Sequence, residues 1–441
     1  MRKSLLRSSG SSSIQNQDSV LLSKLSKSST MVVSKNKGNI NSTIQLIRLN
    51  VDKYLGRYKD KVESCRDINS LSLYIDKSIK NGVIAIDTET TGLDCRNDKI
   101  IGVCLYTPNE KAIYVPLRHK SYITGQLLSN QVSLPDITKQ LSRIVDSGIN
   151  TVFHNAKFDI RVIKNDLGVN IKPYWDTMIA AKLLNNLESA SLKFQYATHI
   201  LNEDKEYDFD SLFKNIDNNS IPIETFTLYA ATDPYITYEL YEYQRKQFEL
   251  FPKIYNVFKD IEMPLIPVVA KMEDTGVCID LDYAYKLSTE YHRKENIVVD
   301  KINKELLKYN DKILAYKSNN PKNKLSNPIN IASPTQLAIL FYDILQVGVI
   351  DEKSPRGVDK DILPKIDLPI AKLIVEYREL EKLIGTYIDK LPQVADKKTN
   401  KIHASFNQIG ADTGRFSSSD PKRIFINWGR KIQLTQGRAI A

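Results

Sequence analysis

The chain has 441 residues, of which 42% are hydrophobic and 26% are charged, and its formal net charge is +10. This length allows two or three domains. The sequence contains no run of 18 apolar residues, so no membrane-spanning helix is expected. The four cysteines show no CxxC spacing and the five histidines show no HxxxH spacing. We therefore expect neither a zinc motif nor a disulfide framework.

The positive charge is concentrated at the two ends of the chain. Residues 1–51 carry +7 and residues 421–441 carry +5, so the 369 residues between them sum to −2. A basic chain suggests a nucleic-acid partner. Here the excess of basic residues lies in the two terminal segments. Evidence for nucleic-acid binding therefore has to come from particular residues and motifs.

The N-terminal segment is rich in Ser and Lys and poor in aromatic residues. Such a composition cannot bury enough apolar surface to offset the entropy of ordering, so we expect a disordered tail. An acid-poor Arg/Ser start also resembles an organelle transit peptide, but this one lacks an amphipathic arginine face. A cytoplasmic location is the favoured expectation, with organelle targeting as the alternative.

From about residue 65 the pattern is typical of an α/β domain. Apolar runs rich in β-branched residues predict strands, and i, i+3, i+4 spacing predicts helices. The expected strands are 83–87, 100–106, 112–117 and one within 149–155, and a long helix is expected over 224–250. Long helices over 282–316 and 369–396 then indicate a second, mostly helical domain.

The first strand ends in two carboxylates, in the sequence "VIAIDTETTG". Asp87 and Glu89 are two residues apart, so a strand would project both to one side about 6–7 Å apart along the chain. Like charges at that separation repel, and a divalent cation with oxygen ligands would hold them. A solvated acidic turn is the alternative.

Three more side chains extend this acidic pair. Asp159 in "HNAKFD" follows a strand end, and Tyr229 and Asp233 in "YAATD" are at i and i+4 on one helical face. Four carboxylates suit two metal ions about 3.5–4 Å apart, which activate water and stabilise a leaving oxygen in phosphodiester hydrolysis. A glycosidase uses a carboxylate pair, but it explains neither the tyrosine nor the fourth acid.

The sequences "DTETTGL", "HNAKFD" and "YAATD" resemble the three motifs of the DEDDy 3′–5′ exonucleases found beside family A DNA polymerases. The resemblance implies a ribonuclease-H-like mixed sheet with flanking helices. It also implies that two Mg²⁺ or Mn²⁺ ions are bound by four carboxylates and that Tyr229 orients the attacking water. The ligands would be Asp87, Glu89, Asp159 and Asp233. By the same match, the terminal nucleotide or the substrate strand would contact Thr90, Leu93, Asn155 and Phe158, the last standing where many relatives have Tyr.

The second half carries an independent resemblance. The sequences "EMPLIPVVAKMEDTGVCID", "YRELEKLIGTYIDKLP" and above all "IHASFNQIGADTGRFSSSDP" resemble the thumb and first palm segment of family A DNA polymerases. This match implies contacts to the template-primer duplex by Asn407, Gln408, Thr413, Gly414 and Arg415. Such residue types position DNA without reading its sequence. Residues 300–330 add seven lysines against three acids, a surface suited to phosphates.

The resulting domain prediction has four parts: a disordered basic tail (1–50), an exonuclease domain (51–255), a thumb and first palm segment (256–421) and an unmatched basic tail (422–441). After "SSSDP" we expect the resemblance to end. No downstream aspartate pair is present to hold polymerase metals. We therefore expect no polymerisation from this chain alone, and we interpret it as the product of a gene interrupted by an intron or a frameshift, as in bacteriophage relatives.

The leading functional prediction is metal-dependent 3′–5′ removal of nucleotides, the proofreading activity of a DNA polymerase. The alternatives are a stand-alone RNA 3′–5′ exonuclease and a non-catalytic module that binds primer-template DNA. The expected partners are single-stranded DNA 3′ ends and primer-template DNA, with a separate polymerase portion as a further candidate and no membrane.

Overall fold

The computed structural model describes residues 42–203, 212–213, 216–411 and 413–419, and these pack into two compact units. The first unit runs to Met272 and includes Gln408–Arg415, whereas the second comprises Glu273–Asn407 and continues from Phe416. This division follows Cα packing. The family-derived boundary after residue 255 stays a prediction, and the predicted tail 422–441 lies outside the described residues.

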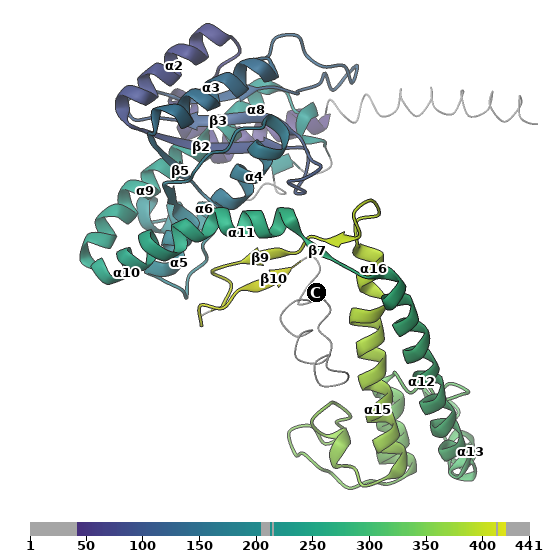
Figure 1. Ribbon diagram of the computed structural model, residues 1–441. Coiled ribbons are helices and arrows are strands. Elements are labelled where there is room, and N and C mark those ends of the chain that lie inside the picture. Colours follow the sequence, from purple (N-terminus) through teal and green to yellow (C-terminus); the bar gives the residue numbers. More distant parts are fainter. Residues whose placement is uncertain (1–41, 204–211, 214–215, 412, 420–441) are drawn as a thin grey trace, which may run out of the picture. The chain divides into compact units, whose positions relative to one another are not determined.

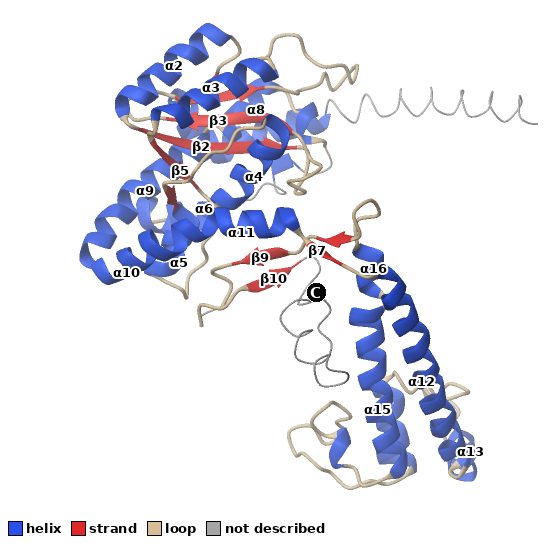
Figure 2. Ribbon diagram, in the orientation of Figure 1, coloured by secondary structure: helices blue, strands red, loops and turns tan. Residues whose placement is uncertain are grey.

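A six-stranded mixed sheet is the centre of the first unit (Figures 1 and 2). Its spatial order is β1-β4-β3-β2-β5-β6, in which β3 is antiparallel to both β2 and β4, whereas the pairs β1–β4, β2–β5 and β5–β6 are parallel. This is the predicted ribonuclease-H-like arrangement. The strands are β1 (Val62–Ser64), β2 (Val83–Thr90), β3 (Ile100–Tyr106), β4 (Ala112–Pro116), β5 (Asn150–Phe153) and β6 (Trp175–Asp176).

The four strands predicted from apolar runs are present. β1 and β6 were not predicted, because two or three residues are too few to show a periodicity. β2 continues to Thr90, three residues beyond its predicted end, so that Asp87 and Glu89 lie within the strand. Its pairing with β3 shifts register between Glu89 and Thr90, which ends the regular ladder directly after the second carboxylate.

Helices cover both faces of this sheet (Figure 2). The predicted helix over 224–250 is two helices, with Ala231 between them. Pro234 explains the break, since a residue without an amide hydrogen suits the first turn of a new helix better than an interior. The helices are α2 (Ile68–Asn81), α3 (Leu134–Ser147), α4 (Ala156–Leu167), α5 (Thr177–Leu184), α6 (Leu192–Tyr196), α8 (Ile223–Ala230), α9 (Thr232–Leu250), α10 (Pro252–Val257) and α11 (Met263–Thr275).

The core of the first unit extends past both predicted limits of the exonuclease domain. Residues 42–55 form a helix whose Ile47 and Val51 are buried in that core, so residues 42–50 are folded rather than part of a disordered tail. The rest of the tail predicted over 1–50 lies outside the described residues. At the other end, the Phe258 ring lies 4.5 Å from the Trp175 ring, centroid to centroid. Trp175 is 2% exposed, so these contacts belong to the centre of the fold.

The second unit is mostly helical, as predicted, with α12 packed against α15. Both long predicted helices are interrupted. Asn310 and Asp311 favour a helix start over an interior, and Gly385 lies in a π-helical turn after α15. The elements are α12 (Leu281–Leu307), α13 (Asn310–Asn319), α14 (Pro334–Ala338), α15 (Pro369–Leu383), α16 (Lys390–Val394), β7 (Val277–Cys278), β8 (Lys401–Ile402), β9 (Ser405–Asn407) and β10 (Ser417–Ser419).

Among the described residues, none of the helices combines the length and the hydropathy that a bilayer span requires.

Candidate active site

Strand β2 presents Asp87 and Glu89 on one face of the sheet. In the antiparallel pairing with β3, Asp87 lies opposite Cys104 and Glu89 lies opposite Gly102. Opposed residues in such a pair share a face, so these four positions form one patch. Glu89 is 9% exposed, and its carboxylate accepts no hydrogen bond from the described residues. A buried carboxylate without a donor is costly unless a cation compensates its charge.

Asp159, on the first turn of α4, is held against the same strand. The amide and the hydroxyl of Thr88 both donate to Asp159 Oδ1, at 3.0 and 2.6 Å. Thr88 lies between the two β2 carboxylates, so its backbone ties Asp159 to their strand. Burial, and next the charge of Asp87, raise the pKa of Asp159 well above its usual range.

A buried carboxylate at the end of β6 fixes the start of α4. Asp176 is 1% exposed, and its two oxygens accept from the amides of Asn155 and Ala156, at 3.1 and 2.8 Å. The same side chain caps α5, because Met178 N also donates to it at 2.9 Å. Asn155 adopts φ 68°, and these bonds hold that turn four residues before Asp159.

Tyr229 and Asp233 enter the site from α8 and α9. Helix α9 packs on β2, β3 and β5, which brings its first turn to the centre of the sheet. The Lys193 ammonium, from α6, contacts the Asp233 carboxylate and lies 5.3 Å from the centroid of the Tyr229 ring. The i, i+4 pair predicted from the sequence thus meets a buried cation.

The charges of the site depend on one another. Burial raises the pKa of Asp87 to about 6. Burial, and next the Asp87 charge, raise the pKa of Glu89 to about 8. Burial lowers the pKa of Lys193 to about 7, while Asp87 and Glu89 oppose that shift. The Lys193 ammonium alone therefore does not compensate the charge of the clustered carboxylates. Carboxylate oxygens are the ligands that hard divalent cations prefer.

The residues predicted to contact the substrate differ in solvent exposure. Leu93 is 88% exposed beyond β2, whereas Thr90 is buried and donates its hydroxyl hydrogen to Gly92 O at 2.6 Å. Asn155 and Phe158 are half-buried at the start of α4. An exposed leucine beside an acidic site suits contact with a base, but the roles of all four residues stay predictions.

The residues of the second half that are predicted to contact the template-primer duplex also differ in solvent exposure. Asn407, Thr413 and Arg415 are exposed. Gln408 is buried, and its amide donates to the backbone oxygen and to Oε2 of Glu262, at 3.1 and 2.7 Å. Gln408 therefore has a structural contact that the sequence did not indicate, and the DNA contacts themselves stay predictions.

Four residues of the site were not singled out from the sequence: Thr88, Cys104, Asp176 and Lys193. Of these, only Thr88 could have been identified as a site residue from the sequence, because it stands between the predicted metal ligands Asp87 and Glu89. The others come from separate strands and helices, and no spacing relates them to the three motifs.

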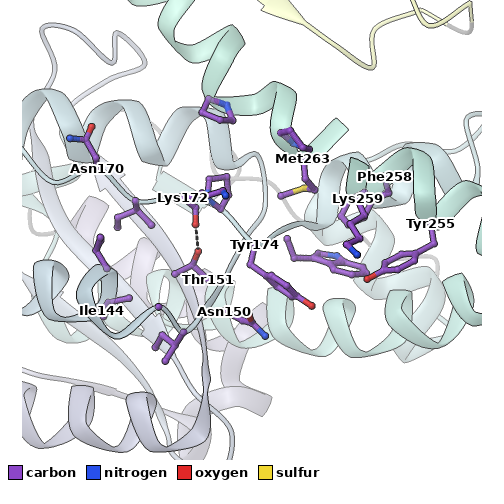
Figure 3. Close-up of a pocket in the computed structure, with 18 residues that line it drawn as sticks. Ile144, Asn150, Thr151, Asn170, Lys172, Tyr174, Tyr255, Phe258, Lys259 and Met263 are labelled. Carbon is purple, nitrogen blue, oxygen red and sulfur yellow. Dashed lines mark hydrogen bonds between the residues drawn. The ribbon is translucent and has the colours of Figure 1, made fainter. Parts of the chain in front are cut away.

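A separate cavity of about 610 Å³ lies elsewhere in the first unit, between β5, β6 and the segment from Tyr255 to Pro267 (Figure 3). Its wall is largely aromatic and aliphatic, and the bond from Thr151 Oγ1 to Lys172 O, 2.8 Å, closes one side. No acidic side chain lines it. The acidic patch on β2 is therefore the stronger candidate for catalysis.

Comparison with known families assigns both halves of the chain. Residues 61–249 match the family model described as 3′–5′ exonuclease. Residues 299–435 match the family model described as DNA polymerase family A. The chain belongs to the family A DNA polymerases. It carries their exonuclease domain and part of their polymerase domain. Exonuclease domains of this kind use divalent metals, and the acidic patch lies within the first match.

Curated relatives agree with this assignment. DNA polymerase I of Synechocystis is 32% identical over 357 residues, which cover 77% of this chain and 33% of the relative. The DNA polymerase of Escherichia phage T5 is 26% identical over 369 residues, covering 77% of this chain and 40% of the relative. This chain thus spans about a third to two fifths of the length of these two family A members.

A solved structure shares the fold. The POL domain of Pol1 from M. smegmatis, in complex with DNA primer-template and dNTP, superposes with a TM-score of 0.59 at 18% sequence identity. The match covers 82% of this family A chain and 55% of that structure.

Proposed function

We propose that this chain is a metal-dependent 3′–5′ exonuclease that shortens single-stranded DNA from its 3′ end and releases nucleoside monophosphates. One observation carries the proposal: the half-buried Asp87 lies together with the buried acids Glu89 and Asp159, and Lys193 joins Asp233 to them. Such an arrangement is costly without cations, and it coincides with the family's exonuclease domain.

The donor set fits two Mg²⁺ or Mn²⁺ ions, held by the four carboxylates. Bound metal supplies an activated water and stabilises the leaving oxygen of the phosphodiester. Tyr229 would orient that water; its ring packs against Phe213 at 5.0 Å, centroid to centroid, and it belongs to the buried helix α8. Thr90 and Leu93 would contact the terminal nucleotide, and Asn155 and Phe158 would contact the substrate strand.

A nuclease assay with three variants tests the proposal. A DNA strand labelled at its 5′ end should be shortened to mononucleotides with Mg²⁺ and stay intact with EDTA. Asp87→Ala or Asp233→Ala should slow turnover by about 10³-fold or more, because a lost metal ligand removes several kcal/mol of transition-state stabilisation. Tyr229→Phe keeps the ligands and should cost less, about 10- to 100-fold. Full activity of Asp87→Ala at saturating Mg²⁺ would contradict the assignment.

A second function, binding of primer-template DNA, is supported by the polymerase-family match of the second half. Thr413 and Arg415 are exposed there, as contact with DNA phosphates requires. The inactive Asp87→Ala chain should bind a primer-template duplex, and Arg415→Ala should weaken that binding. Equal turnover of RNA and DNA strands would instead favour the stand-alone RNA exonuclease.

A further inference from the structure

The cavity of about 610 Å³ in the first unit lies at the other end of β5 from the acidic patch. Its wall includes Asn150 and Thr151, where β5 begins, and the segment Lys172–Trp175 that leads into β6. Asp159, by contrast, follows the end of β5 on α4. Cavities of a few hundred Å³ hold one small organic ligand. This cavity is therefore a candidate binding site distinct from the catalytic one.

The wall of the cavity is aromatic and is held in place by hydrogen bonds between β5 and β6 (Figure 3). Tyr174 N donates to Thr151 O at 2.9 Å, and Thr151 Oγ1 donates to Lys172 O at 2.8 Å. The buried Trp175 ring lies 6.4 Å from the Tyr174 ring and 6.3 Å from the Tyr255 ring, centroid to centroid. Tyr174 is 43% exposed, so part of its ring is available to stack on a planar ligand.

Four polar side chains of the cavity have no partner among the described residues. The carboxamides of Asn150 and Asn170 form no hydrogen bond there, and the ammonium groups of Lys172 and Lys259 form no ion pair. Lys259 belongs to the π-helical turn Phe258–Glu262, a distortion that is frequent at functional sites. None of the described acidic side chains lines the cavity. The wall thus offers two positive charges and two carboxamides to a ligand.

We propose that this cavity binds a free nucleoside monophosphate. The base would stack on Tyr174, and a carboxamide would form hydrogen bonds to the edge of the base, as asparagine does with adenine. A single phosphate group carries a charge of about −1.5 to −2 at neutral pH, which the ammonium groups of Lys172 and Lys259 complement. The inference goes beyond the proposed function, because this binding needs neither the carboxylates nor a metal.

Tryptophan fluorescence of the full chain tests the site, because Trp175 is part of its wall. The chain has two tryptophans, so Trp428→Phe leaves Trp175 as the single indole of the parent protein. The titrant is dAMP in the presence of EDTA, with excitation where adenine does not absorb. The emission should change to saturation, with a half-point below about 1 mM. Deoxyadenosine, which lacks the phosphate, should bind about fivefold more weakly or worse.

Two substitutions in this parent separate the base from the phosphate. Tyr174→Ala should weaken dAMP binding about tenfold or more, because the stacking ring is lost. Lys172→Met should weaken dAMP binding about threefold or more and leave deoxyadenosine binding unchanged. The matched control is Tyr285→Ala, which removes a 60% exposed tyrosine of the second unit and should bind dAMP as the parent does.

Several results would overturn the inference. These are no saturable change in the parent, equal binding of dAMP and deoxyadenosine, or unchanged binding in Tyr174→Ala. If Tyr174→Ala does not fold, the exposed Lys172→Met decides, and its unchanged affinity for dAMP overturns the proposal. Tighter binding of an oligodeoxyadenylate strand, lost in Tyr174→Ala, would replace the free nucleotide by a nucleotide of a DNA strand.

The proposed exonuclease is tested separately from this site. Asp87→Ala in the same parent should bind dAMP with unchanged affinity, and a loss of binding there would place the ligand at the carboxylates and overturn the cavity as its site. Mg²⁺-dependent DNA shortening without dAMP binding in EDTA rejects this inference alone. Binding of dAMP in EDTA by a chain that does not shorten DNA rejects the exonuclease alone.

Discussion

At the scale of single residues, the ammonium group of Lys193 supplies positive charge to the carboxylates of the metal-free site. It contacts Asp233, and its charge acts on Asp87 and Glu89. A buried cation in an acidic site stabilises the metal-free protein. The same cation opposes the entry of further positive charge.

Replacing this lysine should therefore strengthen metal binding. Lys193→Met keeps the apolar stem and removes the charge, so Mg²⁺ should bind at least about fivefold more tightly, because a like charge near the metal site is gone. Isothermal titration of the DNA-free protein measures this. Lys164→Met, an exposed lysine on α4, is the control for loss of one charge and should bind Mg²⁺ as the wild type does. Weaker binding by Lys193→Met would show that Lys193 assists the metal.

The raised pKa values of the β2 carboxylates predict a pH dependence of metal affinity. The pKa of Glu89 is about 8 and that of Asp87 about 6, so between pH 6 and 8 this pair holds one proton that Mg²⁺ must displace. Affinity should therefore rise about tenfold per pH unit across this window and level off above pH 8. Lys193, with a pKa lowered to about 7, acts in the same direction by losing its charge as pH rises. Titrations at pH 6, 7 and 8 measure the slope. Glu89→Gln should flatten it, and a constant affinity in the wild type would contradict the assignment.

At the scale of elements, one carboxylate positions two helices. Asp176 accepts amide hydrogens at the starts of α4 and α5, and α4 carries Asp159. The site therefore depends on a residue that needs no contact with metal or DNA.

Asp176→Ala should reduce both stability and activity. Loss of a buried cap with several donors should cost about 2–4 kcal/mol, more than the roughly 1 kcal/mol typical of an exposed cap. The matched control is Asp67→Ala, which removes the exposed cap of α2, where Asp67 accepts from Ser70 N at 2.9 Å. Urea unfolding and single-strand turnover should both separate the two variants. Equal losses in the two would show that Asp176 is an ordinary cap.

At the scale of the whole molecule, the first unit should fold and act by itself, provided that its limits follow its core. Ile47, Val51, Phe258 and Met263 all belong to that core, and a shorter fragment of residues 60–255 would lack all four. Burying a large apolar side chain contributes about 1.5–3 kcal/mol, against a typical domain stability of about 5–15 kcal/mol.

A fragment of residues 42–272 should therefore unfold cooperatively and keep nuclease activity, whereas a fragment of residues 60–255 should be largely unfolded. Thermal unfolding followed by circular dichroism compares them, with the intact chain as reference. The longer fragment should be slightly less stable than the first unit of the intact chain, because it lacks the Gln408 bonds to Glu262. Equal stability of the two fragments would contradict this account of the core.

The sequence by itself determined the strand that carries Asp87 and Glu89, the helical character of the segments that carry Tyr229 and Asp233, and the α/β class. These are local properties, because alternation along a strand and i, i+4 spacing follow from backbone geometry within a few residues. The same locality explains why the three motifs could be related to the exonuclease family without a structure.

Only the tertiary structure decided which other groups meet those residues. Cys104 reaches Asp87 through strand pairing, Lys193 reaches Asp233 across 40 positions, and Asp176 holds the start of α4 from the end of β6. The extension of the core to residues 42–55 and to Phe258 is of the same kind. Contacts between distant segments depend on strand register and helix packing, which no short stretch encodes. The same contacts bury the ionisable groups of the site and so shift their pKa values.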